Sequence, residues 1–272
     1  MNRVLGKVAA VPLKVLWLVM AVIPGLHVPE WLIAWIWHLD RSEEEALRYL
    51  TLMSQKYGYE RVEQLAESIL TTHPLGSVAA YAGLIAMTQG EIENATEWLN
   101  RAKACDLGTP ELVLQLELAL GGQHGEDTEV DIASRIVARR DVSMPLTRSA
   151  LTVLATSALH KRQWLEAQTI LDRIFHIEDP IHLRWMRWVA AVGQGQVQKA
   201  QQFFDAAWKE SAPKDAFFFQ AYGWFLLNEI DQGKSAITEA LSAGASPHRV
   251  EALCRSLGIQ VEHGTFELKE TD

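Results

Sequence analysis

The sequence predicts an all-α protein built from about six helix pairs that follow one another along the chain. Two observations lead to this prediction. Small or apolar residues recur in pairs twelve positions apart, and successive pairs begin 33 to 36 residues apart or at twice that interval. The first forty residues lack this pattern, and only two residues between 8 and 39 are charged. A helix that presents Gly or Ala to its neighbour buries little surface alone, so such pairs are expected to stack into a solenoid.

The recurring pairs are clearest between residues 77 and 108, where two helices meet at Gln89-Gly90. Along the chain the paired residues are Leu50 with Val62, Gly83 with Ala95, Ala155 with Ala167, Trp188 with Ala200, and Gly223 with Ser235. Their first members are separated by 33, 72, 33 and 35 residues. Because 72 is two periods of 36, a degenerate unit is expected near Ala119.

This pattern resembles the tetratricopeptide (TPR) repeat, a helix–turn–helix unit of about 34 residues. The resemblance covers roughly Ser42 to Pro247 and is strongest around Gly83, Gly90 and Ala95. It implies a right-handed α-solenoid. We expect four parts in all: a hydrophobic membrane-anchor segment at 1–41, a TPR-like repeat domain at 42–247, a capping helix at 248–258 and a polar tail at 259–272.

The apolar N-terminal segment is predicted to attach the chain to a membrane as a helical hairpin. Between residues 8 and 39 only Lys14 and Glu30 are charged, and Pro24-Gly25 divides the run into two short helices. A basic stripe on an apolar helix suits anionic headgroups, and tryptophans suit the membrane–water interface. The expected membrane-contacting residues are Arg3, Lys7, Lys14, Trp17, Trp31, Trp35 and Trp37.

Two alternatives stay open for this segment. In the first, its helices pack onto the first repeat as a hydrophobic cap. In the second, a single helix from about Val4 to Ile23 spans the bilayer. If the anchoring interpretation holds, removal of residues 1 to 40 leaves a folded, soluble repeat domain.

The helix pairs follow with recognisable starts and turns. Ser42 and Glu45 have capping-box spacing, and three glutamates favour a helix start there. Thr109-Pro110 begins the third unit, in which the stretch GGQHGEDTE is expected to be a solvated acidic loop. Turns inside the first, fourth, fifth and sixth units are expected at 57–58, 161–163, 193–195 and 229–231. Ser246-Pro247 begins the capping helix, and the polar tail is expected to be loose.

Composition narrows the possible functions. The formal charge of −9 and the pI near 5.5 argue against a nucleic-acid partner. Cys105 and Cys254 lie about four repeats apart, too far to bond within a stacked array, which favours a reducing compartment. No metal-ligand spacing, phosphate-binding loop or catalytic motif is found. We therefore expect no enzymatic activity, no cofactor and no small-molecule substrate.

The TPR resemblance implies a concave groove lined by the first helix of each pair. The residues that it places there are Leu84, Met87, Thr156, Leu159, Trp185, Val189, Phe217, Gln220, Trp224 and Leu227. Family members that clamp a peptide carboxylate carry Lys and Asn at these places, and this chain does not. An apolar groove suits an amphipathic or hydrophobic helix or peptide. The alternative for Trp185 and Val189 is ordinary core between repeats, whereas Trp224 is expected to be exposed.

These observations predict a membrane-anchored adaptor or scaffold that recruits a protein partner and contacts membrane lipid. Two alternatives remain: a permanent accessory subunit of a membrane complex, and the helical scaffold of an enzyme. The cytoplasmic (inner) membrane is the expected location, with the repeats on the cytoplasmic side and the periplasmic side left open.

Overall fold

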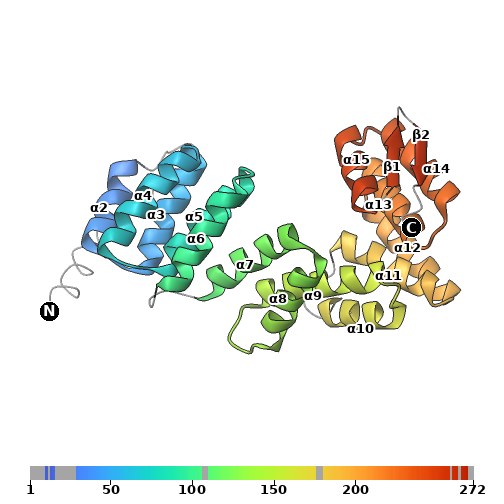
Figure 1. Ribbon diagram of the computed structural model, residues 1–272, viewed down its shortest axis with the longest axis horizontal. Helices are drawn as coiled ribbons and strands as arrows, with labels where there is room; N and C mark the ends of the chain where they lie inside the picture. The colour runs from blue at the N-terminus through green and yellow to red at the C-terminus, as the bar shows by residue number, and fades with distance from the viewer. Residues whose placement is uncertain are drawn as a thin grey trace. The chain divides into compact units, whose positions relative to one another are not determined.

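The computed structural model describes residues 10–11, 13–15, 29–105, 110–175, 180–257, 259–262 and 265–268. The chain divides into two compact units, Met1–Ile132 and Ala133–Asp272, which are described separately as unit 1 and unit 2. Almost all of the described residues lie in helices (Figure 1). The prediction of a mainly α-helical chain with sequential helix pairs is therefore confirmed.

The helices of unit 1 follow one another in short steps. They are α2 (Glu30–Leu39), α3 (Glu43–Lys56), α4 (Tyr59–Thr72), α5 (Gly76–Thr88), α6 (Ile92–Ala104) and α7 (Pro110–His124). Helix α8 (Glu126–Ala138) contains the boundary between the two units. Helix α5 packs along α6, and the core of unit 1 gathers apolar side chains from α2 through α7.

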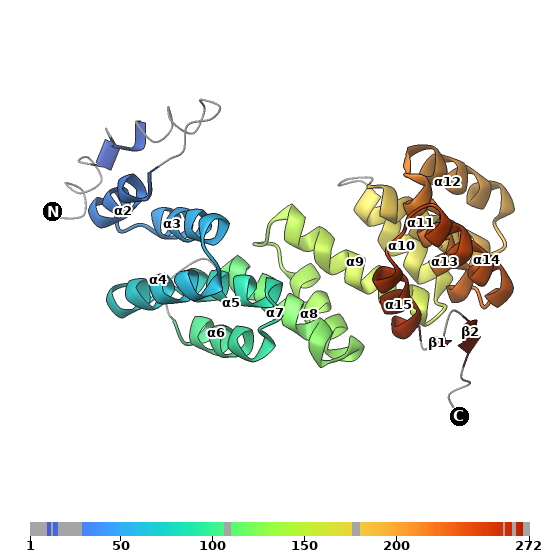
Figure 2. The same ribbon diagram turned by 90° about the horizontal axis from the view of Figure 1, so that it is seen from above.

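Unit 2 is made of three further pairs, a single helix and a hairpin. Its elements are α9 (Met144–His160), α10 (Trp164–Phe175), α11 (Ile181–Gly193), α12 (Val197–Glu210), α13 (Pro213–Leu226), α14 (Ile230–Ser242), α15 (Pro247–Ser256), β1 (Ile259–Glu262) and β2 (Thr265–Leu268). Both views show α13 and α14 side by side, as successive helices of a pair are expected to be (Figures 1 and 2).

Four pairs share one turn, in which three residues join the helices and the middle residue is left-handed. The middle residues are Gly90 (φ 81°), Arg162 (φ 56°), Gly195 (φ 71°) and Asn228 (φ 66°). In each turn the next N–H bonds to a carbonyl five positions earlier, at 2.8–3.0 Å. This is the Schellman arrangement, which satisfies carbonyls at the end of the first helix. The left-handed residues are 72, 33 and 33 positions apart, so the turn marks the repeat.

The position of this turn corrects the pair of packing residues that was predicted for the sixth repeat, which is formed by α13 and α14. In the other three pairs that share it, the packing residues lie five positions before the end of the first helix and three after the start of the second. The equivalent residues in α13 and α14 are Ala221 and Gly233, and both are buried. Ser235, the predicted partner of Gly223, is exposed. The predicted pair, Gly223 with Ser235, was therefore wrong by two positions. Gly223 is small because it lies against the Trp188 ring, as described below.

Gly83 lies where a neighbouring helix approaches, as predicted. A Cβ atom there would stand 2.5 Å from Cδ2 of Leu116 on α7 and 3.1 Å from Cβ of Trp98 on α6. Both distances are below ordinary van der Waals contact. The missing side chain therefore lets α5 pack closely against both helices.

In the third pair, formed by α7 and α8, the structure has helix where the sequence suggested an acidic loop. Helix α7 continues to His124, and Gly125 alone, at φ 112°, separates it from α8. The acidic residues of the expected loop instead form the first turn of α8. Negative charge is favourable at a helix N-terminus, which accounts for the helix starting there.

Helix α2 packs onto the first repeat. Ile33 and Trp37 belong to the core of unit 1, and the Trp37 ring lies edge-on to His73 at 5.7 Å. Trp31 and Trp35 point away and are 57% and 58% exposed. The prediction that Trp37 contacts the membrane was therefore wrong. The inner face of α2 instead packs on the first repeat, as the alternative of a hydrophobic cap predicted.

Lys14 also has a role inside the fold. Its ammonium lies 2.7 Å from Asp40 and 2.8 Å from Glu45, and both carboxylates are buried. Burial alone lowers the pKa of Lys14, but hydrogen bonds to the two carboxylates outweigh it, and the pKa is raised. Lys14 thus contacts protein carboxylates in place of the expected headgroups.

Several predictions for the N-terminal segment concern residues that the structure does not describe. Arg3, Lys7 and Trp17, and most of the possible span from Val4 to Ile23, lie outside the described residues. Among the helices that the structure does describe, none combines the length and apolar character needed to cross a membrane.

The C-terminal end adds two short strands to the helical fold. Strand β1 pairs antiparallel with β2, with Ile259 opposite Leu268, and Ile259 is buried against the core that includes α15. We expected a loose tail here, which is wrong for these two strands. The sequence Ile259–Glu262 alternates apolar and polar residues, and this alternation favours a strand.

Candidate partner-binding site

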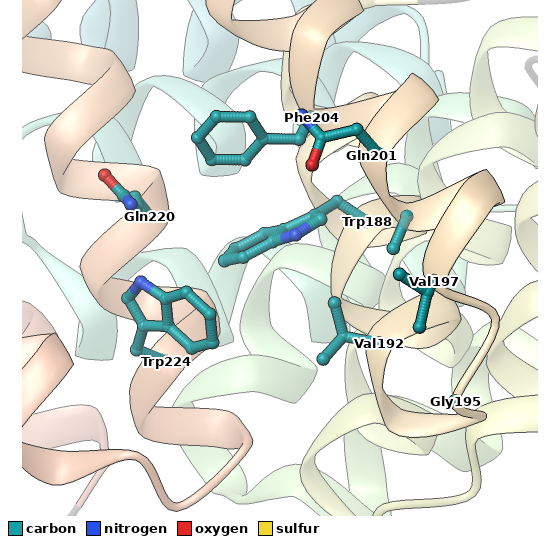
Figure 3. Close-up of a pocket in the computed structure, with 9 residues that line it drawn as sticks. Trp188, Val192, Gly195, Val197, Gln201, Phe204, Gln220 and Trp224 are labelled. Carbon is teal, nitrogen blue, oxygen red and sulfur yellow. The ribbon is translucent and has the colours of Figure 1, made fainter.

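Unit 2 contains a cavity of about 340 Å³ between α11, α12 and α13 (Figure 3). Most of its lining is apolar. The lining residues are Trp188, Val192, Gly195, Val197, Ala200, Gln201, Phe204, Gln220 and Trp224. Each of the three helices contributes side chains, because the turn at Gly195 brings α12 back alongside α11.

The floor of the cavity is the indole of Trp188, which is only 4% exposed. The ring of Trp224 stands perpendicular to it at 5.1 Å, and Phe204 packs against it at 5.6 Å. Gly223 makes this arrangement possible, since a Cβ atom there would overlap the Trp188 ring. Edge-to-face contacts of this kind are a favoured packing of aromatic rings.

A second aromatic layer supports the floor. Trp185 packs edge-on against Trp188 at 5.7 Å and against Phe204 at 5.4 Å. Its indole N–H donates a hydrogen bond to Ser211 Oγ at 3.1 Å. Trp185 is 2% exposed, so it positions the cavity floor without lining the cavity.

The cavity is electrically neutral. No lining residue is charged, and its polar groups are the primary amides of Gln201 and Gln220. The Gln201 amide donates to Asp205 Oδ1 at 2.8 Å.

The predicted groove residues separate into two groups. Leu159, Trp185 and Val189 are buried core, so their assignment to an open groove was wrong. The others are partly exposed, and their role in binding stays a prediction: Leu84, Met87, Thr156, Phe217, Gln220, Trp224 and Leu227.

Few of these residues come together. Gln220 and Trp224 line the cavity, and Phe217 lies one turn away on α13. Thr156 is on α9, where its hydroxyl donates to the Thr152 carbonyl at 2.9 Å. Leu84 and Met87 belong to α5 in unit 1.

The α12 wall was missed by the sequence analysis, which looked for binding residues on the first helix of each pair. Val197, Gln201 and Phe204 recur at helical spacing along α12 and face the cavity. Val197 is 77% exposed. The helical spacing of Val197, Gln201 and Phe204 was the feature of the sequence that could have indicated this wall.

The shared turn and the paired packing residues show that the described residues form a repeat of helix pairs. No known family description matches the sequence, and no curated protein matches it. Among solved structures, it is similar to a tetratricopeptide repeat protein from Parabacteroides merdae ATCC 43184, at 14% identity and a TM-score of 0.47. That match covers 92% of this chain and 91% of the other. MamA from AMB-1 is similar at 17% identity and a TM-score of 0.42, over 64% of this chain and 96% of its own.

Proposed function

We propose that this protein is a membrane-anchored adaptor or scaffold that binds a protein partner through the cavity of unit 2. The observation that carries the proposal is the neutral, aromatic cavity itself. Aromatic side chains in concave, desolvated sites supply much of the binding energy of protein interfaces. Helix-pair repeats commonly present such binding surfaces. In the described residues, no His, Cys, Asp or Glu side chains gather into a group that suits a metal ion.

Membrane attachment is the second part of the proposal. Trp31 and Trp35 are more than half exposed on α2, one helical turn apart. Their rings suit the membrane–water interface, and Lys14 is the only charged residue between residues 8 and 29 of the preceding sequence. We propose the cytoplasmic membrane as the location, with the repeats on the cytoplasmic side and the periplasmic side as the alternative.

Site-specific crosslinking tests the adaptor function. A photoreactive amino acid at position 197, at the cavity, should give one discrete adduct with a second protein in cells. The matched control is position 165, because Leu165 on α10 is 71% exposed and lies outside the cavity. Equal adducts from the two positions, or none from position 197, would contradict the proposal.

A permanent accessory subunit of a membrane complex is the second candidate. It is favoured by the two exposed tryptophans on a helix whose other face is already docked on the repeats. Purification in detergent separates the two functions. A fixed stoichiometry with other membrane chains indicates a subunit, whereas an exchangeable partner indicates an adaptor.

A further inference from the structure

The cavity in unit 2 has room for a side chain that projects from a partner protein. It holds about 340 Å³, and most of its lining is apolar.

The α12 wall of the cavity extends from Val197 to Phe204, which is about 10 Å of helix axis at 1.5 Å per residue. One turn beyond Phe204, the Trp208 ring meets Phe217 of α13 edge-on at 5.1 Å. Val197, at the other end of the wall and beside the turn at Gly195, is exposed, so the cavity meets solvent there.

Two amides flank this space from different helices. Figure 3 shows Gln201 on α12 and Gln220 across the cavity on α13. Each primary amide both donates and accepts hydrogen bonds, which is what a peptide main chain requires of its neighbours. Among the residues that the structure describes, no protein group bonds to the Gln220 amide.

We propose that the cavity takes one apolar side chain from a partner protein, with Gln201 and Gln220 bonding to the main chain beside that residue. The inference rests on the proposed function and specifies its ligand. A charged side chain is excluded, since no lining group would pair with it and an unpaired buried charge is costly.

Blocked amino acids test this proposal on the full-length chain. N-acetyl-leucine methylamide should bind with a Kd of about 1 mM, as expected for a ligand of its size. Binding is observed as shifts of the Trp188 and Trp224 indole N–H signals in NMR spectra of ¹⁵N-labelled protein. The lysine and aspartate analogues should leave both signals unchanged.

Variants separate the side-chain pocket from the amides. Val197→Glu places a charge at the entrance and should weaken the leucine probe about tenfold or more, whereas the control Leu165→Glu should not. Gln220→Leu should weaken the leucine probe but leave toluene binding unchanged, because toluene has no main chain. Unchanged signals outside the cavity verify the fold of each variant.

Several outcomes would overturn the inference. These are binding of the charged analogues equal to that of leucine, absence of any shift, or loss of toluene binding in folded Gln220→Leu. A Trp224 shift that grows with protein concentration alone would assign the cavity to a second copy of this chain.

If the probe fails while position 197 still crosslinks, the adaptor function stands and only its ligand is wrong. If the probe binds without any crosslink, the adaptor function fails and the cavity remains an apolar side-chain site.

Discussion

Gly223 shows how a single missing side chain shapes the cavity of unit 2. Its backbone lies against the Trp188 ring, and this close approach sets Trp224, the next residue, perpendicular to Trp188. The sequence suggested a small residue at a repeat position, and Gly223 met that description. Its actual contact is with a tryptophan 35 positions earlier, which a local pattern does not contain. Gly83, by contrast, has the predicted role, because its neighbours lie on α6, its partner within the pair, and on α7, the first helix of the next pair.

Substitution of Gly83 tests this packing. Gly83→Ala should cost less than a larger side chain, because its single added carbon meets a methyl group of Leu116 at 2.5 Å and Cβ of Trp98 at 3.1 Å. Gly83→Leu overfills the contact and should lower the free energy of unfolding by about 1–3 kcal/mol. Thermal melting followed by circular dichroism measures both. The control is Ser68→Leu on the exposed side of α4, which should change stability by less than about 0.5 kcal/mol. Equal melting temperatures for Gly83→Leu and the wild type would mean that α5 and α7 are packed differently.

At the scale of the element, the recurring turn is a better marker of the repeat than the packing pairs. Gly90, Gly195 and Asn228 are residue types that adopt left-handed backbone readily, so three of the four turns carry a visible signal. Arg162 carries none, and only its place between two helices suggests a turn. The sequence therefore predicted most helix pairs, yet it missed the α12 wall, because packing periodicity does not reveal which helix face remains open.

Arg162 offers a stabilising substitution. A left-handed backbone costs a residue with a side chain about 1–2 kcal/mol, and Gly avoids this at an entropic cost of about 0.5–1 kcal/mol. Arg162→Gly should therefore raise the free energy of unfolding by about 0.5–1 kcal/mol. Gly195→Ala at the equivalent position should lower it by a similar amount. Chemical denaturation of the two variants measures the difference. If Arg162→Gly is the less stable chain, the turn at 161–163 does not have this backbone.

At the scale of the whole molecule, the apolar N-terminal sequence shows where sequence reasoning stops. Burial against a repeat and burial in a membrane both remove apolar surface from water, so composition alone does not separate them. Lys14 meets Asp40, 26 positions away, and only the folded chain reveals that contact. Removing residues 1 to 40 would take Ile33 and Trp37 out of the core of unit 1, so we no longer expect the remainder to stay fully folded.

The two faces of α2 can be tested against each other. Replacing Trp31 and Trp35 together by Ala should abolish flotation of the full-length chain with anionic vesicles and leave melting nearly unchanged, because both rings are exposed. Trp37→Ala should instead cost about 3–5 kcal/mol of stability, because that ring is buried. Vesicle flotation and circular dichroism report the two effects. Persistent flotation of the folded double variant would remove these residues from the membrane surface.

Because the same turn recurs along the chain, the cavity of unit 2 is made by one 33-residue repeat segment placed after α11. Residues 196–228 contain both α12 and α13 and begin and end at equivalent points of two turns. Excising these 33 residues joins Gly195 to Glu229 and leaves α11 followed by α14 through an intact turn sequence. Both walls of the cavity disappear in that one step, since neither belongs to a complete pair on its own. This cavity lies at the junction of successive pairs, so gain or loss of a single 33-residue module would create or erase the proposed binding site in one step.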